Sequence, residues 1–152
     1  QIPHGRYLAL IESLALPVCQ FTCAPRCRRF RGEATYGYDH LTHLPFYGFR
    51  LHVRVCWTGV LCQMERTPGN GQELAAAEDL TAGTSGVVLG NRNFWAPRLR
   101  EQLAHCGIQL LAPFRRRTQG PRPHLSRVPS RWRYRIDTIF GQLVERTALG
   151  CM

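Results

Sequence analysis

The sequence contains no lysine, although basic residues outnumber acidic residues by twenty to ten. Every basic side chain other than histidine is therefore an arginine, whose planar guanidinium binds phosphate oxygens in pairs. A formal net charge of +10 and an isoelectric point near 10.0 indicate a polyanionic partner, and nucleic acid is the leading inference. The alternative is a basic protein that has no such ligand.

Long apolar runs are also missing. No stretch approaches the roughly 18–20 apolar residues that cross a bilayer, and residues 7–18 are interrupted by Glu12 and Pro17. Nothing has the form of a signal peptide. These absences predict a soluble, intracellular protein with no membrane partner. A hydrophobic content of 44% excludes a disordered chain, and the length fits a single domain over residues 1–152.

The seven cysteines are an odd number, and no secretory segment accompanies them, so a disulfide scaffold is not expected. Three of them, Cys19, Cys23 and Cys27, recur at a spacing of four, but zinc sites usually add a second close pair. Three histidines could complete such a site: His40, His43 and His52. Buried thiols are the expectation, and a zinc-binding module is the alternative.

Hydrophobic periodicity predicts alternating strands and helices. The expected strands cover residues 7–13, 46–57, 60–66, 87–89 and 108–112, and the expected helices cover residues 73–80, 97–105 and 131–147. Pro17 closes the first strand, and residues 26–37 form an irregular connection. Residues 114–130 are a basic loop over the surface. This order predicts a mixed α/β sheet with helices packed on its faces.

Alternation within residues 46–57 separates an apolar face from a polar one. The apolar face carries Phe49, Leu51, Val53 and Val55, and the polar face carries Arg50, His52 and Arg54. We therefore expect His52 on the surface.

Six blocks, in order, resemble the DDE transposases of bacterial insertion sequences. The strand block reads Ile11-Glu12-Ser13, a turn reads Thr67-Pro68-Gly69-Asn70, a later block reads Gly90-Asn91-Arg92-Asn93-Phe94, and the last reads Arg135-Ile136-Asp137-Thr138. Residues 31–34 and 46–52 supply the two remaining blocks, with the latter similar to a Gly-aromatic-basic-Leu-His hairpin. The resemblance covers roughly residues 8–146 and implies a ribonuclease-H-like fold.

The resemblance implies catalytic roles for four residues. Glu12 stands at the first metal-binding Asp, Asn91 at the second, Asp137 at the usual Glu, and Glu73 at an auxiliary acid. Glu12, Asn91 and Asp137 would hold Mg²⁺ or Mn²⁺, and binding is expected to be weak because an amide carries no charge. The implied activity is two-metal DNA strand cleavage followed by strand transfer. The substituted acids leave a non-catalytic, basic DNA-binding remnant as the alternative.

The arginines supply candidate phosphate contacts: Arg50, Arg92, Arg115, Arg116, Arg117, Arg131, Arg133 and Arg135. The partners implied by the resemblance are the element ends and a target DNA, bound by a homodimer at the nucleoid in the bacterial cytoplasm. Because few residues precede the first strand, the chain is expected to be a truncated, degenerate copy of such a transposase.

Overall fold

The computed structural model describes residues 7–40, 42–56 and 58–112, together with six helical positions between 134 and 146. Its elements are β1 (Leu8–Cys19), η1 (Phe21–Arg26), β2 (Thr35–Asp39), β3 (Leu44–Cys56), β4 (Leu61–Pro68), α1 (Glu73–Thr81), β5 (Gly86–Gly90), η2 (Arg92–Phe94), α2 (Pro97–His105) and β6 (Ile108–Leu111). The predicted loop 114–130 and most of the predicted helix 131–147 lie outside the described residues. Within the described part, no helix has the length and apolarity needed to cross a membrane.

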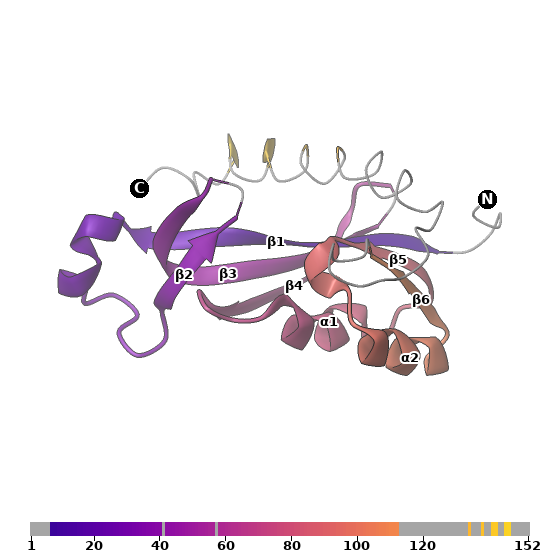
Figure 1. The fold of residues 1–152 in the computed structure, drawn as a ribbon. Helices are drawn as coiled ribbons and strands as arrows, with labels where there is room; N and C mark the ends of the chain where they lie inside the picture. The colour runs from indigo at the N-terminus through magenta and orange to yellow at the C-terminus, as the bar shows by residue number, and fades with distance from the viewer. Residues whose placement is uncertain are drawn as a thin grey trace.

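One six-stranded mixed sheet organises the fold (Figure 1). The strand order is β2-β3-β1-β5-β6, and β4 pairs with β3. β3 is antiparallel to β1, β2 and β4, whereas β5 runs parallel to β1, and β6 runs parallel to β5. Parallel strands need a crossover connection, and α1 and α2 provide the helices that precede β5 and β6. This arrangement confirms the predicted mixed α/β sheet.

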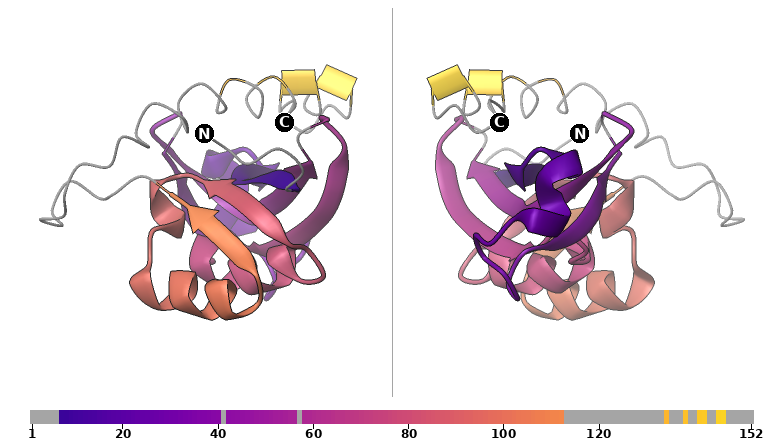
Figure 2. Two further views of the ribbon diagram at one scale, coloured as in Figure 1. Left: turned by 90° about the vertical axis from the view of Figure 1, so that its right-hand side faces the viewer. Right: turned by 90° about the vertical axis from the view of Figure 1, so that its left-hand side faces the viewer.

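α1 and α2 pack on the same face of the sheet (Figures 1 and 2). Ala9, Ile11 and Val88 point from the strands into a cluster with Leu80 of α1 and Leu103 of α2. The alternate residues of β1 and β5, together with two residues of β3, form a second apolar cluster on the opposite face: Leu8, Leu10, Val53, Val55, Val87 and Leu89. The first half of β1 is therefore buried on both faces, as its unbroken apolar run predicts.

Local signals set the bounds of α2. Pro97 occupies the first turn, where its missing N–H costs nothing. Gly107 follows the helix with a φ of 78°, a left-handed conformation that terminates helices readily. The helix therefore covers the predicted residues Pro97–His105.

β1 extends further than predicted. The prediction that Pro17 closes the strand is wrong, because β1 continues to Cys19 and pairs Pro17 with Gly48 of β3. β5 pairs only with Leu8–Ile11 of β1, so this part of β1 has one paired edge among the described residues. Proline is tolerated on such an edge strand because one side of it needs no donor.

Two further predictions about the antiparallel half were wrong. Residues 35–37, expected in an irregular connection, belong to β2, which forms by pairing Thr35–Asp39 with Leu44–Gly48 of β3. His52, expected on the surface, is fully buried. β3 lies between β1 on one edge and β2 and β4 on the other, and α1 contacts it, so its polar face is covered.

Candidate functional site at the carboxyl end of β5

The site begins where β1 and β5 stop pairing. Their parallel register ends at Ile11 and Gly90, so the next residues, Glu12 and Asn91, leave the paired region together. Asn91 donates a hydrogen bond from Nδ2 to Oε1 of Glu12, and the backbone N–H of Ser13 donates to the same oxygen at 3.2 Å. Glu12 is only 9% exposed. The structure thus brings together two of the predicted catalytic residues.

Asn91 also uses its side-chain oxygen. Oδ1 accepts the backbone N–H of Asn93 at 2.7 Å, which closes a local turn of the kind that asparagine favours. Phe94 follows in this turn and is fully buried beneath Gly90. Both ends of the Asn91 amide are therefore engaged, with its NH₂ toward Glu12 and its oxygen toward the backbone.

Glu73, the first residue of α1, is the centre of a second polar cluster. Its Oε1 accepts hydrogen bonds from Ser13 Oγ at 2.7 Å and from Asn93 Nδ2 at 3.0 Å. Arg50 Nη1 lies 3.6 Å from the same oxygen. Oε2 is buried and has no hydrogen-bond partner among the residues that the structure describes.

Asn91 and Asn93 link the two carboxylates across the edge of the sheet. Alternation along β1 places Glu12 on the same face as Leu10, opposite α1, and turns Ser13 toward α1. Asn93 therefore binds Glu73 on the helix side, while Asn91 binds Glu12 on the other side.

Arg50 is held inside this cluster. Its side chain is 11% exposed, pairs with Glu73 and donates from Nη2 to the backbone oxygen of Tyr38 at 2.8 Å. The predicted phosphate contact is thus occupied by protein groups in this structure. A polar cavity of about 620 Å³ lies beside it, lined in part by Gln72, Glu73 and Asn93. A larger cavity of about 950 Å³ lies away from this cluster, between α2, β6 and Tyr7.

His52 contributes structure to the site. Burial lowers the pKa of its imidazole to about 4, the nearby Arg50 guanidinium lowers it as well, and the Glu73 carboxylate opposes both. The ring is therefore neutral at pH 7. Its Nε2 lies 2.8 Å from Oγ1 of Thr67 on β4, in a hydrogen bond. His52 thus ties β3 to the last residues of β4, shortly before α1.

The described residues do not fit a two-metal centre. A divalent cation such as Mg²⁺ takes oxygen ligands, yet the group that Asn91 turns toward Glu12 is its NH₂, a donor. Across the described ranges, no three His, Cys, Asp or Glu side chains are grouped to hold a metal ion. Glu12 is the single carboxylate that this face of the described sheet offers at the site.

Several predicted residues lie outside the description. They are Asp137, Arg115, Arg116, Arg117, Arg131, Arg133, Arg135 and the side chain of Arg92. Sequence reasoning assigned no role to Ser13 or Asn93, which bind Glu73. Each stands within two positions of a predicted catalytic residue, and that proximity was the available signal.

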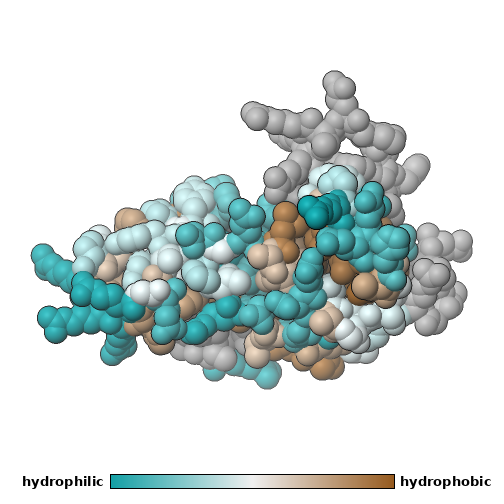
Figure 3. Space-filling view, turned by 90° about the horizontal axis from the view of Figure 1, so that it is seen from below, coloured by the Kyte–Doolittle hydropathy of each residue, from teal (hydrophilic) through white to brown (hydrophobic). Residues whose placement is uncertain are grey.

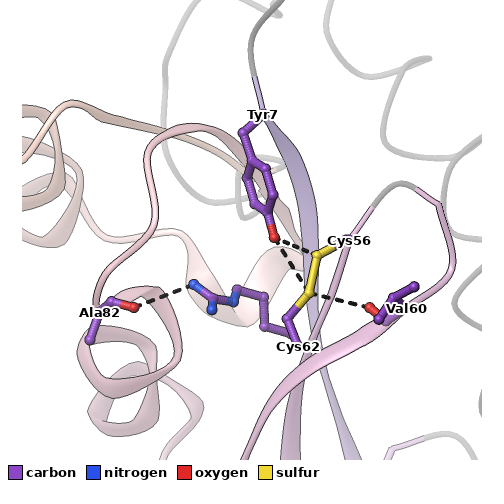
Figure 4. The surroundings of a disulfide bond; sticks show 6 residues. Tyr7, Cys56, Val60, Cys62 and Ala82 are labelled. Carbon is purple, nitrogen blue, oxygen red and sulfur yellow. Dashed lines mark hydrogen bonds between the residues drawn. A yellow bond between two sulfur atoms is a disulfide. The ribbon is translucent and has the colours of Figure 1, made fainter.

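The cysteines correct two expectations. Cys56 and Cys62 form a disulfide across the β3–β4 hairpin, with their Cα atoms 6.4 Å apart, because the register places these positions within bonding range. The Tyr7 hydroxyl contacts both sulfurs (Figure 4). Cys23 is exposed rather than a buried thiol. Among the described residues, which include Cys19, Cys23 and Cys27, no group of three side chains is suited to a metal ion, so the structure adds no support to the zinc alternative.

Comparisons with known proteins agree with this architecture. The chain matches the family described as Transposase DDE domain over residues 4–150. No curated protein matches it significantly. A solved structure, the synaptic complex of piggyBac transposase with hairpin DNA, is 13% identical with a TM-score of 0.51. The match covers 74% of this chain and 24% of that transposase. The ribonuclease-H-like fold expected from the sequence is thereby confirmed. Because the family match spans nearly every residue, the chain belongs to the family of transposase DDE domains.

Proposed function

We propose that this chain is a DNA-binding transposase domain in which metal-dependent strand cleavage is blocked at Asn91. The observation that carries the proposal is the pair of hydrogen bonds made by the Asn91 amide, to Glu12 and to the backbone of Asn93. Transposase DDE domains generally use divalent metal ions. In this chain a neutral amide donor occupies the space beside Glu12 where a cation would otherwise balance charge.

An aspartate at position 91 would reverse this arrangement. One carboxylate oxygen could still accept the Asn93 N–H, but the other would face Glu12 without a proton between them. Two ionised carboxylates in contact repel each other unless a proton or a cation lies between them. Asn91→Asp should therefore create a demand for a divalent ion that the unaltered chain lacks.

Nicking of supercoiled plasmid in Mn²⁺ tests the proposal. We expect cleavage by Asn91→Asp and none by the unaltered chain. Asn93→Asp is the matched control, because it adds the same charge two residues away, beside Glu73 instead of Glu12. As a second readout, Mn²⁺ should raise the melting temperature of Asn91→Asp while leaving that of the unaltered chain unchanged.

The other outcomes lead to different functions. Nicking by both proteins would show that the amide is tolerated, and strand cleavage and transfer by the unaltered chain would replace our proposal. That second function is favoured by the retained carboxylates, Glu12 and Glu73, on either side of the Asn91–Asn93 turn. Nicking by neither protein, with DNA binding intact, would leave a non-catalytic DNA-binding remnant.

DNA is the proposed partner for reasons of charge. The chain carries a net charge of +10 with arginine as its sole strong base, and phosphate contacts through arginine give salt-dependent binding. The solved piggyBac transposase is itself a complex with hairpin DNA. Recognition of element ends and target DNA by a homodimer at the nucleoid, with the arginines of residues 115–117 and 131–135 as contacts, forms part of this proposal.

A further inference from the structure

A basic lobe lies at the end of β1, away from the candidate site. β5 accompanies β1 only as far as Ile11, and β1 then continues with β3 to Cys19. Residues 20–34, here called the η1 lobe, follow at that end of the strand and project beyond the sheet (Figure 1). α2 lies toward the opposite end of the molecule (Figure 1).

The η1 lobe carries four exposed arginines: Arg26, Arg28, Arg29 and Arg31. No ion pair between described residues involves any of them. The lobe contains one acidic residue, Glu33, whose carboxylate is 3.4 Å from Arg66 of β4. The space-filling view shows hydrophilic side chains projecting from this end of the molecule (Figure 3). The lobe therefore presents positive charge that no described protein group neutralises.

Internal contacts hold the lobe in a defined shape. The ring of Phe30 packs edge-on against Phe49 of β3, with centroids 5.3 Å apart. The backbone oxygen of Phe30 accepts N–H groups from Glu33 at 3.0 Å and Ala34 at 2.9 Å. Ala34 is buried against Phe49 and Tyr47. The arginines on either side of Phe30 are thus presented from an anchored turn.

We propose that the η1 lobe binds the phosphate backbone of duplex DNA at a distance from the candidate site, an inference that rests on the proposed DNA-binding function. Cys19 lies seven positions beyond Glu12 along the extended strand, a span of about 23 Å at about 3.3 Å per residue. Duplex DNA advances about 3.4 Å per base pair, so the lobe contacts phosphates about 7 base pairs from the site. This surface supplies DNA contacts in addition to those of the arginines in residues 115–117 and 131–135.

Fluorescence anisotropy with a 20-base-pair duplex, at 50 and 200 mM NaCl, tests the proposal. The variant is Arg28→Gln/Arg29→Gln, and the matched control is Arg98→Gln/Arg100→Gln, which removes the same charge from exposed positions on α2. Each phosphate contact contributes about 0.9 to the salt slope. The measured quantity is the ratio of the DNA affinity of the unaltered chain to that of the variant. If the variant loses two contacts, this ratio should be about 12-fold larger at 50 mM than at 200 mM salt.

The control variant should keep the salt slope of the unaltered chain, and Arg28→Lys/Arg29→Lys should restore it. Urea unfolding of each variant verifies that the fold is intact. Equal slopes for the unaltered chain and Arg28→Gln/Arg29→Gln would overturn the lobe contact while leaving the proposed function standing. An equal decrease of the salt slope in Arg28→Gln/Arg29→Gln and in the control variant would also overturn the lobe contact, because it would reflect the change in net charge alone. Failure of the unaltered chain to bind DNA would overturn both proposals.

Discussion

Acidification should destabilise this fold through His52. The side chain is fully buried, and burial lowers its pKa from 6.5 to about 4. The unfolded chain takes up a proton at pH values where the folded chain does not. The stability that this residue contributes is therefore present in full above about pH 6.5 and is lost as the pH falls toward 4.

The size of the effect follows from the two pKa values. When His52 is protonated in the unfolded chain and neutral in the folded chain, the free energy of unfolding is lower by on the order of 3 kcal/mol. Between pH 7 and pH 5 the same linkage gives about 2 kcal/mol. With a urea dependence of about 2 kcal/mol per molar, the unfolding midpoint should fall by about 1 M over this range.

Urea unfolding at pH 7, 6 and 5, followed by tryptophan fluorescence, measures this loss in the unaltered chain and in His52→Gln. The glutamine carboxamide does not titrate and retains polar atoms for the bond to Thr67. Carboxylates titrate in both proteins, so the difference between them isolates His52. We expect the unaltered chain to lose about 2 kcal/mol more than the variant between pH 7 and pH 5. The same pH dependence in both proteins would refute the reasoning.

Three further predictions concern stability at pH 7, each measured by urea unfolding. In Gly48→Ala the new Cβ would lie 2.1 Å from the backbone oxygen of Leu16, so we expect a loss of about 2 kcal/mol. Gly141→Ala meets no atom within 4 Å and should leave the free energy unchanged or raise it by up to about 1 kcal/mol; equal effects would contradict the close-contact explanation. Phe94→Ala empties a fully buried site and should cost about 3–5 kcal/mol; a loss below about 1 kcal/mol would show that Phe94 is not a core residue. Glu73→Gln leaves a buried guanidinium without its anion and should cost on the order of 3 kcal/mol, whereas an unchanged midpoint would mean that the pair contributes nothing.

Elements with local signals were predictable from the sequence. α2 agrees with its prediction residue for residue, because Pro97 and Gly107 mark its ends in the chain itself. The bounds of β5 were predicted to within one residue at each end from its apolar run. β2 was missed because its half-exposed residues show no core pattern of their own and become a strand only through pairing with β3.

The candidate site was likewise predictable from the sequence only in part. The motifs that resemble a transposase named Glu12, Asn91 and Glu73, and the structure places Asn91 beside Glu12 and links the turn after it to Glu73 through Asn93. Nothing in the motifs indicated that Arg50 would be buried against Glu73. An alternating strand shows which residues share a face, but whether that face meets water depends on elements distant in the sequence.

The sequence alone determined the large positive charge, the alternation of strands and helices, and the family resemblance, because these depend on composition and local order. The tertiary structure alone decided that His52 is buried and neutral, that the Asn91 amide turns its NH₂ toward Glu12, and that an exposed basic lobe stands at the end of β1. Each of these follows from strand register and from packing between residues far apart in the chain.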